Sequence, residues 1–252
     1  MQFGRFVDQF HADLARCRSQ AELGGLLAAT LRELGFDYFA LLHHASLTAG
    51  GARLIRIDNY PPGWVAELTT AELASEDPVQ LASGRTNVGF AWEQLDRLVS
   101  LTRRQRDILE GSRRHGIGSG FTVPANVPGE PVGSCSFAVR CGRALPARHL
   151  HCAELVGAHA FGAARRLHGY PAGSGRPHLS RREQACLRLA AAGKSDWEIG
   201  RILGIAEETA RQYLKRARAA YDVPTRTQLV VHGLRDGWIG YGEAIPPIGG
   251  MG

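Results

Sequence analysis

Residues 179–221 constrain the fold most, because they carry the start and stop signals of three consecutive helices. Ser180 lies three residues before Glu183, which is the spacing of a capping box at a helix N-terminus. Gly193 suits the left-handed conformation that ends a helix, and Gly204 suits a tight turn. These signals predict three helices in helix-turn-helix order, bounded by Ser180 and Gly193, by Asp196 and Leu203, and by Glu207 and Tyr221.

The third of these helices is rich in basic and polar side chains. It fits the major groove of duplex DNA, where its first turns can reach base edges while Arg and Lys contact phosphates and guanines. A charged helix that only faces solvent is the alternative, but the capped helices and the turn spacing favour DNA. The side chains expected to contact DNA are Glu207, Thr209, Arg211, Gln212, Lys215, Arg216 and Arg218.

The charge distribution agrees with a polyanionic partner for this region. The chain carries a formal net charge of +6, and residues 179–238 hold eleven Lys or Arg against seven Asp or Glu. Glu207 and Glu208 oppose phosphate contact at the start of the third helix, although a carboxylate there can accept a hydrogen bond from cytosine or favour the helix dipole. The basic excess therefore lies mainly in the C-terminal region.

Length and composition predict two soluble globular domains. The chain has 252 residues, of which 44% are hydrophobic and 21% charged, so each domain can bury a core. Residues 170–178 form a Pro, Gly and Ser cluster that is typical of a linker. We therefore expect an N-terminal domain over 1–169, a linker over 170–178 and a C-terminal domain over 179–252.

Cysteine usage and hydropathy argue against several other classes. The five cysteines are odd in number and include no Cys-x-x-Cys pair, so neither a disulfide scaffold nor a zinc site is expected. We expect reduced, mostly buried thiols, no metal and no cofactor. The first ten residues show no signal-peptide pattern, and no run of about 18 apolar residues occurs, so a cytoplasmic protein without a membrane partner is expected.

The N-terminal domain is expected to be α+β, with an antiparallel sheet packed between helices in an α-β-α sandwich. Helical periodicity predicts helices over 3–17, 23–34, 102–115 and 152–167, and short helices after Pro62. Short apolar runs predict strands over 36–42, 52–57, 121–126 and 132–139, with turns at 46–51 and 128–130 and a helix break at 116–120. A small all-α domain is expected to follow.

A specific pattern runs through residues 179–239. It consists of Glu183, Leu187 and Gly193, with the tail over 223–239 after the third helix. This combination resembles the DNA-binding domain of LuxR-type regulators, in which the three matched positions serve packing and turn formation. The resemblance implies a transcriptional regulator with a LuxR-type helix-turn-helix domain.

The N-terminal half carries a second set of motifs. They are Asn59-Tyr60-Pro61-Pro62-Gly63-Trp64, Asp77-Pro78-Val79, Trp92, Gly120-Phe121-Thr122-Val123-Pro124, Gly133 and Ser136. Their order and spacing resemble the domain of the same family that binds acyl-homoserine lactones. The ligand-binding residues that this resemblance implies are Tyr60, Trp64, Leu68, Asp77, Trp92, Gly120 and Ser136.

The resemblance gives each polar group of such a lactone a partner in a dry pocket. Trp64 would donate its indole N–H to the lactone carbonyl, and Asp77 would accept from the amide N–H. Tyr60 and Ser136 would donate to the acyl carbonyl. A buried Asp77 without a partner would cost several kcal/mol, so the carboxylate needs either ligand or solvent.

Three further positions shape the implied pocket. Trp92 would form a wall over the lactone ring, and Gly120 marks a position where a side chain would intrude. Leu68 stands at a position where the family often has Tyr. The Leu side chain would admit a branched or aryl acyl group. Taken singly, the seven residues have ordinary structural explanations as core aromatics, strand residues or, for Asp77 before Pro78, a helix cap.

The leading hypothesis is a quorum-sensing regulator in which lactone binding orders the N-terminal domain and a homodimer binds a dyad promoter site. The alternative is an orphan member of the family that responds to a non-lactone small molecule or to no ligand. An enzyme that uses Cys135 or Ser136 as its nucleophile is a further alternative. The sequence contains no Gly-x-Ser-x-Gly elbow, no metal-binding His pair and no phosphate loop, so no enzymatic activity is expected. A phosphorylated response regulator would need acidic residues on a parallel α/β sheet, whereas two helices open this chain.

Overall fold

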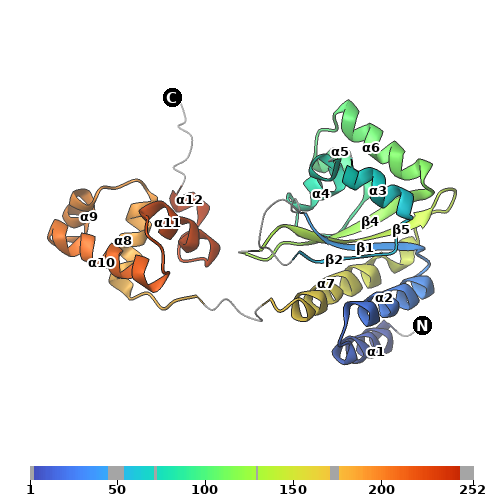
Figure 1. Cartoon of the computed structure of the whole chain (residues 1–252), viewed down its shortest axis with the longest axis horizontal. Coiled ribbons are helices and arrows are strands. Elements are labelled where there is room, and N and C mark those ends of the chain that lie inside the picture. The colour runs from blue at the N-terminus through green and yellow to red at the C-terminus, as the bar shows by residue number, and fades with distance from the viewer. Residues whose placement is uncertain (1–2, 45–53, 71–72, 129, 171–175, 245–252) are drawn as a thin grey trace. The chain divides into compact units, whose positions relative to one another are not determined.

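A computed structural model describes residues 3–44, 54–70, 73–128, 130–170 and 176–244. The chain forms two compact units, Met1–Ala172 and Gly173–Gly252, which are called unit 1 and unit 2 below. The predicted linker over 170–178 includes the boundary between them, and its residues 171–175 lie outside the described residues. Figure 1 shows a sheet with helices on both faces in unit 1 and a group of helices in unit 2.

Unit 1 is built on a five-stranded sheet in the order β2-β1-β5-β4-β3. Its strands are β1 (Tyr38–His43), β2 (Arg56–Asp58), β3 (Phe90–Ala91), β4 (Ile117–Ala125) and β5 (Gly133–Arg140). Every described pairing is antiparallel. The predicted α+β class with an antiparallel sheet is therefore confirmed.

Helices cover both faces of this sheet, so unit 1 is an α-β-α sandwich (Figure 1). One face is covered by α2 (Gln20–Leu34) and α7 (Leu150–Leu167), on which α1 (Phe3–Arg16) packs. The other face carries α3 (Pro62–Thr70), α4 (Pro78–Ser83), α5 (Leu95–Leu98) and α6 (Arg103–Arg114). Short 3-10 turns occur at η1 (Leu73–Glu76), η2 (Trp92–Gln94) and η3 (Ala147–His149).

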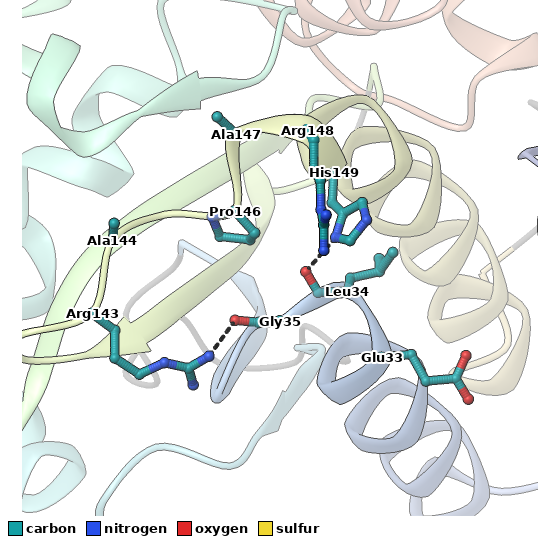
Figure 2. Close-up of a pocket in the computed structure, with 9 residues that line it drawn as sticks. All are labelled: Glu33, Leu34, Gly35, Arg143, Ala144, Pro146, Ala147, Arg148 and His149. Carbon is teal, nitrogen blue, oxygen red and sulfur yellow. Dashed lines mark hydrogen bonds between the residues drawn. The ribbon is translucent and has the colours of Figure 1, made fainter. Parts of the chain in front are cut away.

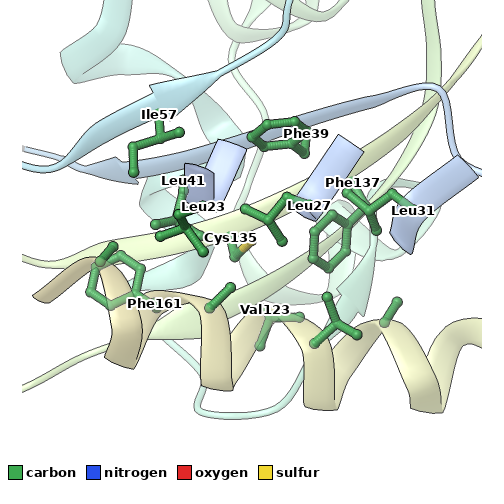
Figure 3. Close-up of a cluster of buried hydrophobic side chains, with 14 of the residues drawn as sticks. Leu23, Leu27, Leu31, Phe39, Leu41, Ile57, Val123, Cys135, Phe137 and Phe161 are labelled. Atoms are coloured by element: carbon green, nitrogen blue, oxygen red, sulfur yellow. The ribbon is translucent and has the colours of Figure 1, made fainter. Parts of the chain in front are cut away.

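The main core lies between the sheet and the layer of α2 and α7 (Figure 3). Leu23, Leu27 and Leu31 repeat at helical spacing on α2 and are buried. They share one cluster with Phe137 of β5 and Phe161 of α7. Because full burial of one such side chain stabilises a fold by about 1.5–3 kcal/mol, this cluster holds the sheet firmly against both helices.

Strand alternation separates this core from the opposite face of the sheet. In β5, Cys135, Phe137 and Val139 belong to the core cluster. Ser134 and Ser136 take the alternate positions, so they point to the face that carries α3 and α6, and both are buried. That face therefore offers hydroxyl groups as well as apolar side chains.

Unit 2 contains α8 (Arg181–Ala191), α9 (Asp196–Leu203), α10 (Glu207–Ala220), α11 (Arg226–Arg235) and α12 (Tyr241–Ala244). Ser180, Ser195 and Thr225 cap α8, α9 and α11 in capping boxes. Gly204 ends α9 with a φ of +64°. A Cβ atom on Gly200 would lie 2.8 Å from the carbonyl oxygen of Ile205, so the tight turn between α9 and α10 requires glycine there.

Most predicted elements are confirmed, and the differences have physical reasons. Strand β3 is absent from the sequence predictions because two residues are too short to show alternation. The segment 116–120, predicted only as a helix break, starts β4 at Ile117. The predicted turn at 46–51, the first two residues of the strand at 52–57 and residue 129 of the second turn lie outside the described residues.

All five cysteines are free, and only Cys141 is exposed, which confirms the expectation of mostly buried thiols. Within the described ranges, no helix is both long and apolar enough to cross a membrane. The same ranges contain no group of three or more His, Cys, Asp or Glu side chains arranged to hold a metal ion.

Candidate functional site

Side chains from separate segments gather on the sheet face that α3 and α6 cover. Trp64 of α3 is buried in one cluster with Ile117 of β4. Tyr60, Leu68 and Trp92 are partly buried and pack against the same cluster. The structure thus brings together four of the residues that the sequence motifs single out.

A chain of hydrogen bonds crosses this face from Trp92 to Ser136. Nε1 of Trp92 donates to Oγ1 of Thr122 at 2.9 Å, and the hydroxyls of Thr122 and Ser136 lie 2.9 Å apart. Thr122 and Ser136 are direct partners in β4 and β5, which explains their contact. Thr122 joins the candidate site through these two contacts, and the predicted ligand set omits it. Its signal was a polar residue two positions after Gly120, on the same face of an apolar strand.

Gly120 lets the Trp92 ring approach the sheet closely. A Cβ atom at position 120 would lie 2.3 Å from Cε2 of Trp92, well inside van der Waals contact. Gly120 is itself buried in β4. A larger residue at this position would therefore displace the indole ring or the strand.

Asp77 combines burial with a helix cap. One of its carboxylate oxygens accepts a hydrogen bond from the backbone N–H of Val79 at 2.9 Å, at the start of α4. Burial raises the pKa of Asp77 to about 6, against the opposing effect of that hydrogen bond. Among the described residues, no Arg, Lys or His forms an ion pair with Asp77. Its charge is stabilised by the backbone N–H groups of Val79 and Gln80 and by the Gln80 side chain.

Tyr60 and Trp64 add hydrogen-bond donors to the cluster, and Tyr60 lies near Asp77. Burial, followed by the negative charge of Asp77, raises the pKa of the Tyr60 hydroxyl, so the hydroxyl remains protonated at neutral pH. Trp64 is 5% exposed and packs beside His115, with ring centroids 6.0 Å apart. Within the part of the chain that the structure describes, the indole N–H of Trp64 has no hydrogen-bond acceptor.

Two cavities in unit 1 lie away from this cluster. The larger, of about 460 Å³, lies between the end of α2 and the loop before α7 (Figure 2). His149 Nδ1 contacts the carbonyl oxygen of Leu34 at 2.8 Å, and Arg143 donates to the carbonyl oxygen of Gly35 at 3.3 Å, so backbone contacts fix its wall. The second, of about 340 Å³, is lined by residues of β4 and α7. Neither is lined by a residue of the predicted ligand set.

Helix α10 buries one side and exposes the other. Ala210, Leu214 and Ala217 are buried in the core of unit 2. Lys215 and Arg216 are exposed, and neither makes a hydrogen bond or an ion pair with any described residue. These two cations are therefore available to a partner outside the unit.

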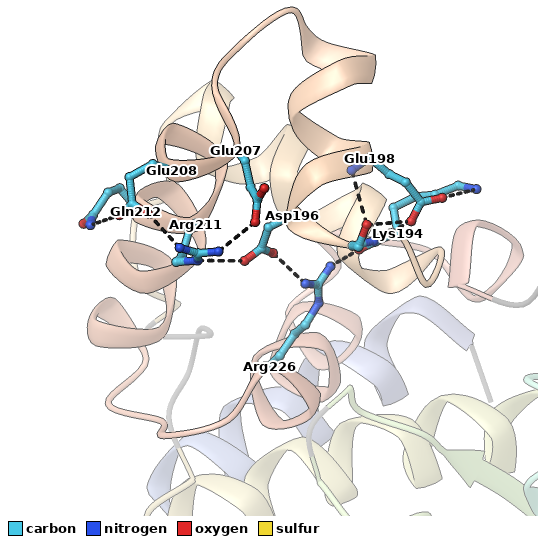
Figure 4. A network of polar contacts seen from close by, with 9 residues as sticks. Lys194, Asp196, Glu198, Glu207, Glu208, Arg211, Gln212 and Arg226 are labelled. Atoms are coloured by element: carbon cyan, nitrogen blue, oxygen red, sulfur yellow. Dashed lines mark hydrogen bonds and ion pairs between the residues drawn. The ribbon is translucent and has the colours of Figure 1, made fainter.

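Arg211 is engaged within unit 2 (Figure 4). Its guanidinium lies 2.7 Å from a carboxylate oxygen of Glu207, 2.8 Å from one of Glu208 and 3.6 Å from one of Asp196. Arg226 of α11 also pairs with Asp196, at 2.8 Å. Arg211 therefore connects α10 to α9, a role that its place in the sequence does not reveal because Asp196 is 15 positions away.

The remaining residues predicted to contact DNA differ in their exposure and in their hydrogen bonds within unit 2. Thr209 is exposed, and Gln212 donates to a carboxylate oxygen of Glu208 at 2.9 Å. Arg218 is half-buried and donates to the carbonyl oxygen of Pro224 at 2.7 Å. Arg218 thus holds the turn after α10 in addition to any outside contact.

Family models match both units of the chain. Residues 19–166, more than half of the chain, match the model described as an autoinducer binding domain, and residues 177–232 match the model of bacterial regulatory proteins of the luxR family. The chain belongs to the LuxR family. It is accordingly a transcriptional regulator with an autoinducer-binding domain and a LuxR-type helix-turn-helix domain, and the family is not one of enzymes.

Relatives of this LuxR-family chain are similar to it in sequence or fold along most of its length. It is 28% identical over 226 residues to the putative HTH-type transcriptional regulator y4qH of Sinorhizobium fredii, across 86% of this chain and 68% of the relative. Its fold is similar to that of Escherichia coli SdiA in complex with octanoyl-rac-glycerol, with a TM-score of 0.64, 22% identity and coverage of 94% and 96% of the two chains. CepR2 from Burkholderia cenocepacia gives a TM-score of 0.50 at 12% identity, over 65% of this chain and 93% of that one.

Proposed function

We propose that this LuxR-family regulator acts in quorum sensing by binding an N-acyl-homoserine lactone in unit 1 and, as a homodimer, a dyad promoter site through α10. The observation that carries the proposal is the convergence of Tyr60, Trp64, Trp92 and Ser136 on one sheet face, with Asp77 close to Tyr60. A few polar groups converging within an apolar surround are typical of small-molecule sites.

The hydrogen-bonding groups of this cluster are complementary to those of a lactone. The indole N–H of Trp64 would donate to the lactone carbonyl, and the ionised Asp77 would accept from the amide N–H. The protonated hydroxyl of Tyr60 and that of Ser136 would donate to the acyl carbonyl. Trp92 and Gly120 would set the depth of the pocket above β4.

The acyl end of the ligand would meet the apolar part of the cluster. Leu68 packs there without a hydroxyl or an aromatic ring, which suits a branched or aryl acyl group. CepR2 is N-acylhomoserine lactone dependent, whereas SdiA has been solved with octanoyl-rac-glycerol. The SdiA complex therefore favours a second candidate function, the sensing of a non-lactone acyl compound.

The DNA-binding half of the proposal assigns 1–169 to ligand sensing, 170–178 to the linker and 179–252 to DNA. Lys215 and Arg216 support it because they are exposed cations on the outer side of α10. Two copies of α10 in a homodimer would contact two half-sites about one helical turn apart.

Thermal unfolding of the full-length chain with a panel of ligands tests the sensing half. The panel holds straight-chain, branched and aryl homoserine lactones together with octanoyl glycerol. A ligand that binds only the folded state stabilises it by about 2.7 kcal/mol at a hundred times its Kd, so the matching lactone should raise the Tm by several degrees. Replacement of Asp77 by Asn should reduce this rise, whereas Asp107→Asn, at an exposed site on α6, should leave it unchanged.

The panel separates the candidates. A Tm rise with lactones alone, lost in the Asp77→Asn variant, supports the proposed function. A rise with octanoyl glycerol alone favours the second candidate, and no rise with any compound contradicts ligand sensing at this site. An equal rise in both Asn variants would place the ligand away from Asp77.

A further inference from the structure

The outer side of α10 is defined by the residues that the helix buries. Ala210, Leu214 and Ala217 face the core of unit 2. Because successive helix residues are rotated by about 100°, the row opposite this buried side contains Glu208, Gln212 and Lys215, at positions i, i+4 and i+7. All three are exposed, and the side chain of Glu208 is 61% exposed.

Glu208 is held in one orientation by its neighbours (Figure 4). Gln212 donates to one carboxylate oxygen at 2.9 Å, and Arg211 donates to the other at 2.8 Å. The hydrogen bond from Gln212 lowers the pKa of Glu208, so the carboxylate is ionised at neutral pH. Each oxygen has a second lone pair, so Glu208 can still accept one further hydrogen bond at each.

Arg211 and Glu207 lie to one side of this row. Arg211 is paired with Asp196 of α9 as well as with both glutamates, so it orients Glu208 and is not itself free. Glu207 and Glu208 together with Asp196 outnumber the cations Arg211 and Arg226 in this network. The start of α10 therefore carries an excess of carboxylates, which disfavours phosphate contact there.

A fixed carboxylate in the major groove can accept from few groups. Guanine presents the acceptors O6 and N7, and thymine presents O4 and a methyl group. Adenine presents an amino group beside the acceptor N7, which would repel a carboxylate. Cytosine presents its N4 amino group beside its own C5–H, with an acceptor on one side only, the O6 of the paired guanine, whereas the adenine amino group lies between two acceptors. Cytosine is therefore the base that suits Glu208 best.

We propose that Glu208 recognises a cytosine in each half-site and is a specificity-determining residue of this regulator, with Arg211 and Gln212 as positioning residues. The inference rests on the proposed function, because it requires α10 to enter the major groove. It predicts a conserved C·G pair at one fixed position of each half-site. Lys215 and Arg216, further along α10, would contact phosphates and so increase the affinity for DNA of any sequence.

Selection of duplex DNA from a random library by the full-length chain tests the inference, with and without the lactone panel. The wild type is expected to enrich a dyad with one invariant C·G pair per half-site. Replacement of that pair by T·A should weaken wild-type binding about tenfold, whereas Glu208→Ala should bind both duplexes alike. Glu208→Ala should also bind unrelated DNA more tightly, because a negative charge is lost.

A matched control is Glu110→Gln, which removes the same charge from an exposed carboxylate that pairs with Arg113 three residues later on α6. This variant should select the wild-type site. If the wild type enriches no motif, the proposed DNA recognition fails. If it enriches a dyad and Glu208→Ala retains the same cytosine preference, only the role of Glu208 is overturned, provided that thermal unfolding shows the variant to be folded.

Discussion

The carboxyl group of Asp77 makes a structural contact and, in the proposed site, a contact with the ligand. One oxygen caps α4 by accepting from the N–H of Val79. In the proposed site, the carboxylate would also accept from the amide N–H of the ligand. Since burial raises the pKa of Asp77 to about 6, the carboxyl titrates within the mildly acidic range, where binding can be measured.

Lactone affinity should therefore fall as the pH falls below about 6. Above that value Asp77 is ionised before the ligand arrives, whereas below it the carboxyl must first release a proton. This release costs about 1.4 kcal/mol, or tenfold in Kd, for each pH unit below the pKa. Titration of tryptophan fluorescence with the lactone between about pH 7.5 and about pH 5 measures the effect.

The Asp77→Asn variant serves as the control for this pH profile. Its amide oxygen can still cap α4, but the side chain does not titrate. Its affinity should be weaker than that of the wild type and nearly independent of pH. A wild-type profile as flat as that of the variant would show that Asp77 does not accept from the ligand.

The sequence motifs identify residues that the structure brings into one cluster, but they do not reveal the contacts between those residues. The motifs select Trp64 and Trp92, which lie in one cluster with Tyr60. The partner of Trp92 is Thr122, whose position depends on the pairing of β4 with β5. Strand register is set by packing across the sheet, so no local pattern reveals such a contact.

At the scale of elements, α10 depends on contacts with both neighbouring helices. Arg211 joins it to Asp196 at the start of α9, and Arg226 of α11 meets the same carboxylate (Figure 4). Lys215 has no such contact among the described residues. Arg211 and Lys215 should therefore affect DNA binding in different ways.

Arg211→Ala and Lys215→Ala are both expected to weaken operator binding while ligand binding stays intact. Lys215→Ala should remove a phosphate contact, which lowers the salt dependence of binding by about one ion and leaves the Tm unchanged. Arg211→Ala should leave the salt dependence unchanged and lower the Tm, because three carboxylates lose their shared partner. Binding isotherms at several salt concentrations distinguish the two. Wild-type affinity in both variants would remove α10 from the DNA interface.

Elements with strong local signals were predictable to within a residue or two. The bounds of α9 are those expected, because Ser195 caps its start and Gly204 ends it. Strands β4 and β5 followed from apolar runs, although β4 begins earlier than expected. Strand β3 and the order of strands in the sheet depend on contacts between distant segments, and the sequence carries no short-range signal for them.

At the scale of the whole molecule, the proposed ligand site and the proposed DNA site lie in different units of the chain. Unit 1 contains the cluster around Trp64, and unit 2 contains α10. A ligand that binds unit 1 can affect DNA binding only through a free-energy coupling, for which the proposed route is dimerisation. Typical couplings of about 1–3 kcal/mol change affinity by roughly 5-fold to 150-fold.

The most direct test of this account is the affinity of the full-length chain for its selected dyad, measured with and without the lactone that raises the Tm most. The account predicts that the lactone changes the operator Kd by at least about fivefold, and that Asp77→Asn reduces this change to less than about twofold. The account would be contradicted if the wild type bound the dyad with the same affinity at zero and at saturating lactone.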